Sequence, residues 1–240
     1  TYELDETSRQ SKGIAIKEYL NIENEERITE IISLSELPKN LYFFFITSKG
    51  IVKKTPVEEF ENVRKSGIYA IKIGEGDFLV NVFLTSGNNE IIIFTRKGNA
   101  IRFHEKDTRP MGRVAQGVIG IKLRKDDSVI GGVILQESKQ IVLVTKYGIG
   151  KRVNPQEFST QKRGGIGIRA IKITSKTGDL IGVKNVSEND EILISTKKGQ
   201  IIRIPVNNIP ILSRNSQGVK LVKLNEDDSV VSMDLVENET

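Results

Sequence analysis

Short runs of β-branched and aromatic residues, each closed by a Thr-x-x-Gly turn, recur along the chain. They occupy residues 43–50, 91–98, 141–148 and 192–199, so their final glycines are 48, 50 and 51 residues apart. A cation stands four residues after each of these glycines, at Lys54, Arg102, Arg152 and Arg203. Apolar runs of this length that end in a glycine turn predict β-hairpins rather than helices.

Four further series share this period. A second set of glycines opens alternating runs, and an arginine stands three or four positions before each of them. The lysine five positions after the last four glycines and an aspartate in a later polar turn also recur. The members are Gly13, Gly67, Gly117, Gly167 and Gly218; Arg9, Arg64, Arg113, Arg163 and Arg214; Lys72, Lys122, Lys172 and Lys223; and Asp77, Asp127, Asp179 and Asp228. Series with one common period establish a repeat of about 50 residues.

Each repeat predicts two strands joined by a glycine turn, a basic polar loop, a strand, an acidic turn and a last strand. One unit cannot bury its Ile, Val and Phe face alone, so neighbouring units must stack. We therefore expect an all-β, propeller-like ring of about five to six four-stranded blades in a single domain, residues 1–240. The expected units are 1–37 (partial), 38–86, 87–136, 137–187 and 188–240. Because the first unit lacks its hairpin, we expect a fragment of a longer protein.

The composition argues against chemistry in this chain. There is no cysteine and only one histidine, His104, so neither a disulfide nor a Cys/His metal site is expected. The paired acids at 126–127 and 227–228 stand in polar turns, and the five tyrosines have no catalytic context. Residues 165–170 imitate a dinucleotide fingerprint, but the segment that follows alternates like a strand and lacks the required acid. No apolar stretch is long enough to span a membrane. We expect no catalytic residue, metal or cofactor.

The positive charge is uneven. The net charge is +5 with a pI near 9.2, and residues 146–176 carry eight cations against the single acid Glu157. If every unit presents its basic loop at the same place, a belt of cations follows the rim, which suits a bent polyanion. A protein-binding propeller, of the kelch or regulator-of-chromosome-condensation type, stays an alternative, although kelch blades usually carry a tryptophan and this chain has none. A propeller hydrolase would need acids or histidines that converge on the central channel.

Residues 161–167, Gln-Lys-Arg-Gly-Gly-Ile-Gly, resemble the Gln-Arg-Arg-Gly-Gly-Lys-Gly box of the bacterial gyrase A subunit. Residues 49–55, 109–112 and 215–219 also look like the C-terminal domain of that family, and the resemblance covers essentially the whole chain. In gyrases the box lies in the first blade, whereas here the best match lies in the third complete unit. We expect 161–167 to be a box-like repeat loop, with the true box before Thr1 or absent, so a topoisomerase IV-like parent stays open.

The resemblance implies a β-pinwheel whose blades exchange strands and which wraps duplex DNA around its rim for a type IIA topoisomerase. It further implies a cytoplasmic, nucleoid-associated parent with ATP and Mg²⁺ as cofactors. The rest of the A subunit, together with the ATPase B subunit, would be the partners in a heterotetramer, with no membrane contact. We expect the DNA-binding residues to be Gln161, Lys162, Arg163, Gly164, Gly165, Gly167, Arg169, Arg9, Lys12, Lys54, Arg64, Lys65, Arg102, Arg113, Lys151, Arg152, Arg203 and Arg214.

Overall fold

Strands and short turns make up nearly all regular structure in the computed structural model, which describes residues 8, 10–13, 15, 18, 26–34, 36–63 and 67–236. The strands are β1 (Tyr42–Thr47), β2 (Ile51–Pro56), β3 (Leu79–Thr85), β4 (Glu90–Thr95), β5 (Asn99–His104), β6 (Val118–Ile119), β7 (Val129–Ile134), β8 (Gln140–Thr145), β9 (Ile149–Val153), β10 (Ile168–Arg169), β11 (Leu180–Val186), β12 (Glu191–Thr196), β13 (Ile201–Pro205), β14 (Val219–Lys220) and β15 (Val230–Val236). Single 3₁₀ turns follow four of them: η2 (Val57–Phe60), η3 (Glu105–Asp107), η4 (Pro155–Glu157) and η5 (Val206–Asn208). No helix of the described residues is long and apolar enough to cross a membrane.

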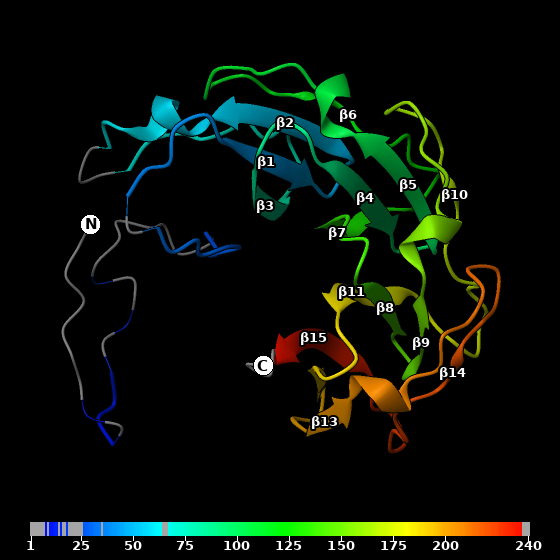
Figure 1. Cartoon of the computed structure of the whole chain (residues 1–240). Helices are drawn as coiled ribbons and strands as arrows, with labels where there is room; N and C mark the ends of the chain where they lie inside the picture. Colours follow the sequence, from blue (N-terminus) through cyan, green and yellow to red (C-terminus); the bar gives the residue numbers. More distant parts are fainter. Residues whose placement is uncertain are drawn as a thin grey trace.

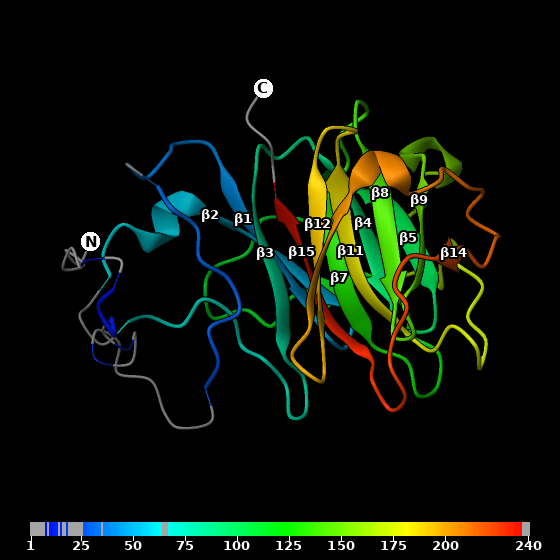
Figure 2. The ribbon, with the colours of Figure 1, turned by 90° about the horizontal axis from the view of Figure 1, so that it is seen from below.

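The strands form four sheets that follow one another along an open arc (Figure 1). From the inside of the arc outwards, the blades are β3-β1-β2-β6, β7-β4-β5-β10, β11-β8-β9-β14 and β15-β12-β13. We number them blades one to four in this order. Seen from below, the longer strands of the blades run in roughly the same direction (Figure 2). The propeller-like fold is confirmed. The described residues hold four blades rather than five to six, and the fourth blade has three strands.

The outermost strand of each of the first three blades comes from the next unit. In blade one, β6 pairs antiparallel with β2, with Ile119 opposite Ile51. In blades two and three, β10 pairs with β5 and β14 pairs with β9. A blade is therefore not a sequence repeat, because each repeat completes the sheet before it. This exchange covers the backbone donors and acceptors that an edge strand would otherwise leave unpaired.

The Thr-x-x-Gly signature forms the hairpin turn of each blade. In blade two, the Gly98 N–H donates to the Thr95 carbonyl over 2.9 Å, and Thr95 Oγ1 accepts from the Asn99 N–H over 3.2 Å. Gly98 has a φ of 80°, which disfavours any residue with a Cβ. The threonine and the glycine therefore recur because the turn needs both.

The acidic turns close the same hairpins. The Asp127 carboxylate accepts from the backbone N–H of Lys97 over 3.0 Å and of Ser128 over 2.8 Å. The equivalent carboxylate, Asp77, accepts from the Ser48 hydroxyl and from the Lys49 N–H. Burial by itself would raise the pKa of Asp77, but these hydrogen bonds outweigh it and hold the pKa below its usual range.

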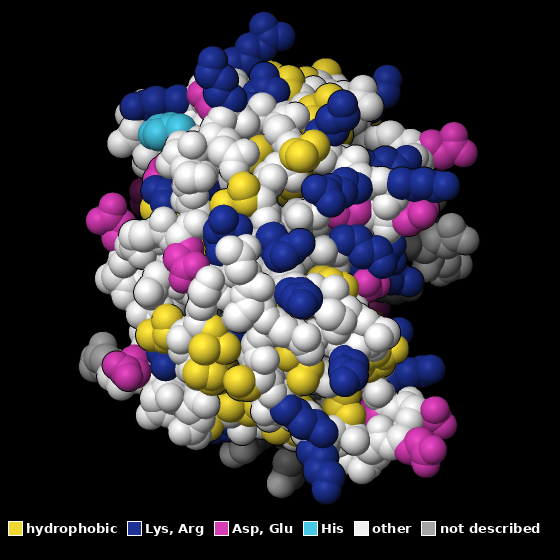
Figure 3. Space-filling model, turned by 90° about the vertical axis from the view of Figure 1, so that its right-hand side faces the viewer, with side chains coloured by type: hydrophobic (Ala, Val, Ile, Leu, Met, Phe, Trp, Pro, Cys, Tyr) yellow, Lys and Arg dark blue, Asp and Glu magenta, His cyan; other side chains and the backbone are white. Residues whose placement is uncertain are grey.

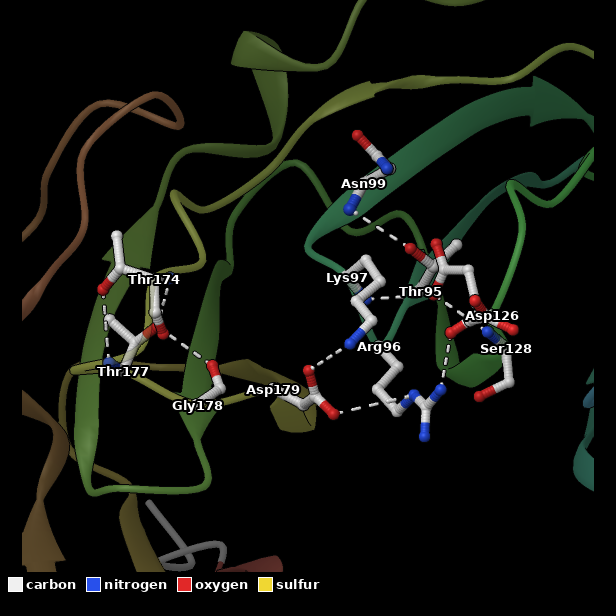
Figure 4. Close-up of polar contacts among 11 residues, drawn as sticks. Thr95, Arg96, Lys97, Asn99, Asp126, Ser128, Thr174, Thr177, Gly178 and Asp179 are labelled. Carbon is white, nitrogen blue, oxygen red and sulfur yellow. Dashed lines mark hydrogen bonds and ion pairs between the residues drawn. The ribbon is translucent and has the colours of Figure 1, made fainter.

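Asp179 departs from this pattern. Its turn is longer, and Thr177 closes it through hydrogen bonds with Thr174. The freed carboxylate reaches back to blade two, where it lies 2.9 Å from Lys97 Nζ and 3.7 Å from Arg96 Nε (Figure 4). The acid therefore links two blades rather than closing its own hairpin.

Three apolar clusters fill the spaces between the blades. One joins Ile92 and Phe94 of blade two to Ile141 and Leu143 of blade three. Equivalent clusters lie between blades one and two and between blades three and four. Each blade therefore buries a face only by stacking on its neighbours, as the hydrophobic pattern predicts.

The second glycine series marks the close approach between an exchanged segment and the blade that receives it. Gly167 has a φ of 69°, and a Cβ there would lie 2.3 Å from the Ala100 carbonyl oxygen. Gly117 and Gly218 meet the Val52 and Gly150 carbonyls in the same way, at 2.6 Å. These glycines allow the exchanged strand to reach its partner.

We predict that Gly167→Ala lowers the free energy of unfolding by about 3 kcal/mol, because it combines left-handed backbone strain with a backbone clash. Gly199→Ala is the matched control, since Gly199 has a φ of 82° but open space around its Cβ position. It should cost only about 1 kcal/mol. Urea unfolding measures both, and equal losses would contradict a role for close approach.

Candidate nucleic-acid interface

Four stretches of chain form the outer edge of the blades, and we call them the rim segments: residues 67–74, 109–125, 158–176 and 209–225. The last three contain the exchanged strands β6, β10 and β14 together with the loops before them. None of the four contains an aspartate or a glutamate. Every charged side chain in these segments is therefore positive, in a chain that holds 31 acidic residues.

Backbone hydrogen bonds join each rim segment to the next one along the arc. The Lys72 N–H donates to the Ala115 carbonyl over 3.3 Å, and the Lys122 N–H donates to Gly165 over 2.8 Å. The Lys172 N–H donates to Ser216 over 3.1 Å. Successive blades therefore present one continuous surface rather than four separate loops.

Exposed cations follow this surface. Figure 3 shows Lys and Arg side chains down the middle of the rim, with Asp and Glu mostly towards its two sides. The exposed cations of the last three rim segments are Arg109, Lys122, Arg124, Lys125, Lys162, Arg169, Lys172, Lys176, Lys220 and Lys223. Acids occur in the 3₁₀ turns η2, η3 and η4 and in the acidic turns that close the hairpins. A polyanion on this face would meet cations along its path and acids on both sides.

The residues named from the sequence divide into several groups. Lys162 and Arg169 are exposed on the rim, Lys12 is exposed outside the rim segments, and Gln161 is partly buried. Arg9, Arg64 and Lys65 lie outside the described residues. DNA contact by the exposed residues stays a prediction.

Three of the named cations are buried, which does not fit the predicted phosphate contact. Lys54 Nζ donates to the Glu105 carbonyl over 3.0 Å and lies 5.1 Å from the Tyr42 ring centroid. Arg152 Nε donates to the Ile209 carbonyl over 2.6 Å. Lys151, the third, is fully buried. All three point into the protein, where they hold the chain of the following unit.

Two further cations are held by carboxylates. Arg102 Nε donates to Glu90 over 3.1 Å, and its Nη1 donates to the Phe158 carbonyl over 3.1 Å in the next unit. Arg203 forms an ion pair with Glu191 on the neighbouring strand. The cations at this repeat position therefore serve the fold first, which corrects the view that they form one outward belt.

The arginines before the landmark glycines are partly buried and tie the rim together. Arg163 Nε donates to the Asp107 carbonyl over 2.8 Å, and its Nη1 donates to Ile119 over 3.0 Å. Arg214 Nη1 donates to the Arg169 carbonyl over 2.9 Å. Arg113 is also partly buried. These guanidinium groups are partly exposed, and some of their N–H groups donate to backbone carbonyls of the protein.

The glycines of the box-like loop also have structural partners. The Gly164 N–H donates to the Gly120 carbonyl over 2.6 Å, and the Gly165 carbonyl accepts from Lys122. The Gly164 amide is therefore already bonded within the protein and is not free to donate to a bound DNA. The glycines allow the loop to lie against the preceding rim segment.

Two lysines occupy the same strand position in alternate blades, where each collects carbonyl groups. Lys151, opposite Leu143 on β8, donates to the carbonyls of Ser213, Arg214 and Ser216 at 2.7 to 3.0 Å. Lys53 in blade one donates in the same way to Ala70, at 2.5 Å, and to Arg113. The equivalent positions in blades two and four hold Ile101 and Ile202. Each lysine thus anchors an arginine-bearing rim loop from below.

Sequence reasoning missed several of these residues. Lys53 carries no periodic signal, because its equivalent in the next blade is an isoleucine. The exposed lysines Lys122, Lys172 and Lys223 belong to a series visible in the sequence, five positions after the landmark glycines, and they were not named as binding residues. Their regular phase was the signal that could have identified them. Within the described part of the chain, no three His, Asp or Glu side chains are placed to hold a metal ion.

Stacked four-stranded blades whose outer strand comes from the following repeat define a strand-exchanging, propeller-like repeat domain. The family model described as "DNA gyrase C-terminal domain, beta-propeller" matches residues 1–35, 41–86, 89–135, 139–187 and 190–237. The chain belongs to this family.

Relatives and solved structures agree. The chain is 37% identical over 235 residues to the DNA gyrase A subunit of Escherichia coli K12 and 40% identical over 232 residues to that of Clostridium acetobutylicum, with 98% and 97% of this chain covered. It spans 27% and 28% of those proteins. A crystal structure of the C-terminal domain of DNA topoisomerase IV superposes with a TM-score of 0.88 at 29% identity, covering 94% of this chain and 71% of that one. A DNA gyrase A C-terminal domain gives 0.82 at 28%, covering 93% and 75%.

We predict that Lys151 makes stability rise with pH between about 8 and 10.5. Burial lowers the pKa of Lys151 from 10.5 to about 8. In this window the unfolded chain binds a proton that the folded chain has lost, so alkali favours the folded state. Urea unfolding of wild type and Lys151→Ile, which copies Ile101 and Ile202, should show a stability difference that increases from pH 7.5 to 9.5 in favour of wild type. A difference that shrinks would contradict the assignment.

Proposed function

We propose that this domain binds duplex DNA along the rim segments and bends it around the arc, without a chemical step of its own. The observation that carries the proposal is the continuous acid-free track of exposed cations between two acidic sides. Lysine and arginine neutralise phosphates and release counterions, a term that does not depend on base sequence.

The arc matches the energetic demand of bending. Bending 20–30 base pairs by 40–90° costs roughly 1–6 kcal/mol. A surface that offers phosphate contacts at each successive blade can offset this cost, because every further contact forms only on bent DNA. The hydrogen bonds between rim segments fix the curvature before DNA arrives.

The family gives this activity its setting. We propose that the chain is the DNA-wrapping part of a type IIA topoisomerase A subunit, whose cleavage tyrosine and ATPase lie elsewhere. Its partners would be the B subunit, in a heterotetramer that uses ATP and Mg²⁺, together with the rest of its own subunit. The parent would act on DNA in the cytoplasm.

Two parents fit the fold, a supercoiling gyrase and a decatenating topoisomerase IV. The solved domains of both kinds superpose well on this chain. Ligation of a nicked plasmid with the domain bound tests for wrapping. We expect a change in linking number that grows with protein concentration, as a wrapper requires. A plasmid that relaxes to the same linking number with and without the domain would contradict wrapping and leave simple binding.

We predict that Lys162→Ala combined with Arg169→Ala weakens DNA binding at low salt and reduces the slope of log K against log salt by up to about 2. Each lost phosphate contact removes about 0.9 from that slope. Both side chains are exposed on the rim, so the fold should be unaffected. Fluorescence anisotropy with a duplex of about 30 base pairs, over a series of KCl concentrations, measures the slope.

The control removes two cations from the hairpin turns, Lys146→Ala with Lys197→Ala. Both lysines are exposed and lie outside the rim segments. This variant has the same net charge as the rim variant, so it should keep the wild-type slope if position matters. Equal losses in the two variants would mean that net charge alone drives binding, and the rim would have no special role.

A further inference from the structure

The rim carries apolar side chains as well as cations. Eight of the fifteen exposed large hydrophobic residues in the described part of the chain lie on the rim or just before it: Val63, Tyr69, Ile73, Val114, Ile119, Ile166, Ile211 and Val219. The exposed fractions are 84% for Tyr69, 74% for Val114 and 52% for both Ile119 and Ile166. Isolated exposed apolar residues are ordinary on protein surfaces, but a concentration on one face marks an interaction surface.

These side chains gather where one rim segment meets the next. Tyr69 stands in the segment that hydrogen-bonds to the loop of Val114, through the Lys72 N–H and the Ala115 carbonyl. Ile119 accepts at its carbonyl from Arg163 in the loop that also carries Ile166. Two junctions between blades therefore present apolar groups outwards. At the third junction, the residues equivalent to Tyr69 and Ile119 are Arg169 and Lys220, two positions after the landmark glycine.

Charge identifies the partner. A protein partner recognised through this face would have to place its own apolar surface on a track without acids, between flanking cations such as Lys122 and Lys162. Duplex DNA suits both features, since phosphates meet the cations while the deoxyribose rings between them offer apolar C–H surface. The mixture of groups therefore favours DNA over a protein.

The bend towards the rim that the proposed function requires argues against intercalation. A side chain inserted between base steps opens the groove it enters and turns the duplex away from that side. DNA wrapped on the rim must instead close towards it, which narrows the inward-facing groove and brings its sugars together. Apolar groups on the inside of the bend can thus pack against sugars without separating bases.

We propose that Tyr69, Val114, Ile119 and Ile166 pack against deoxyribose on the inside of the bent duplex and supply a component of binding that salt does not screen. This inference rests on the proposed DNA-binding function and deepens it. It distinguishes two junctions, where the residue two positions after the landmark glycine is apolar, from the third junction, where that residue is cationic.

The test replaces the apolar groups in pairs, Tyr69→Ser with Val114→Ser and, separately, Ile119→Ser with Ile166→Ser. Affinity for a duplex of about 30 base pairs is measured by anisotropy over a series of KCl concentrations and extrapolated to 1 M. We expect the salt slope of wild type in both variants, because no phosphate contact is lost, and an extrapolated affinity about fivefold to tenfold lower. If Ile166 in the second pair is replaced by Val instead of Ser, the variant should recover most of the lost affinity.

The control pair is Phe78→Ser with Val231→Ser, which are 68% and 53% exposed and lie outside the rim segments. This variant should bind as wild type does. If the affinity of the wild type did not depend on salt concentration, the proposed function would be wrong. A wild-type slope with unchanged affinity in both rim pairs would defeat only this inference and leave the apolar groups to a protein partner.

Base stacking is followed in the same experiment with 2-aminopurine placed along the duplex. We expect its fluorescence to stay quenched on binding, since the bases remain stacked. A strong increase that disappears in the serine variants would show intercalation and overturn the sugar contact.

Discussion

The structure depends on the seating of each exchanged segment against the blade before it. The Gly120 N–H donates to the Gly50 carbonyl, and the Ala170 N–H donates to Gly98, both over 2.8 Å. These bonds satisfy backbone groups at the outer edge of a sheet, which cannot stay unpaired when buried. Because the segment belongs to the next unit, one contact completes a sheet, joins two blades and places the following loop on the rim.

The same contact explains why periodic cations have two different fates. In blades one and three, cations on the strand that receives the exchanged segment are buried against the following unit, while lysines on the exchanged segment itself stay at the outer edge. Lys54 and Arg152 hold the next unit from the inside, whereas Lys122 and Lys172 lie on the exchanged segments and face outwards. A buried ammonium is stable only where several carbonyls surround it, as at Lys151.

The surface combines three kinds of group that act at different ranges. The acid-free rim between acidic sides sets a field that guides a polyanion to one path. In the proposed complex, cations would contact phosphates, and the apolar groups at two junctions would reach the surface between them. Asp179 adds a link between blades two and three on the acidic side, through Lys97 (Figure 4). Charged side chains thus serve both the proposed binding surface and the contacts between blades.

The sequence by itself determined the repeat of about 50 residues, the hairpin turns and the all-β propeller-like fold. Local chemistry carries this information, because a left-handed turn needs glycine and a strand face needs alternating apolar residues. The family resemblance added strand exchange, which no pattern within one unit reveals. Only the tertiary structure decided that Lys54, Lys151 and Arg152 are buried while Lys162 and Arg169 are exposed. A periodic cation looks the same in sequence whether it faces solvent or a carbonyl cage, and the neighbouring blade that makes the difference comes from residues some 50 to 65 positions away.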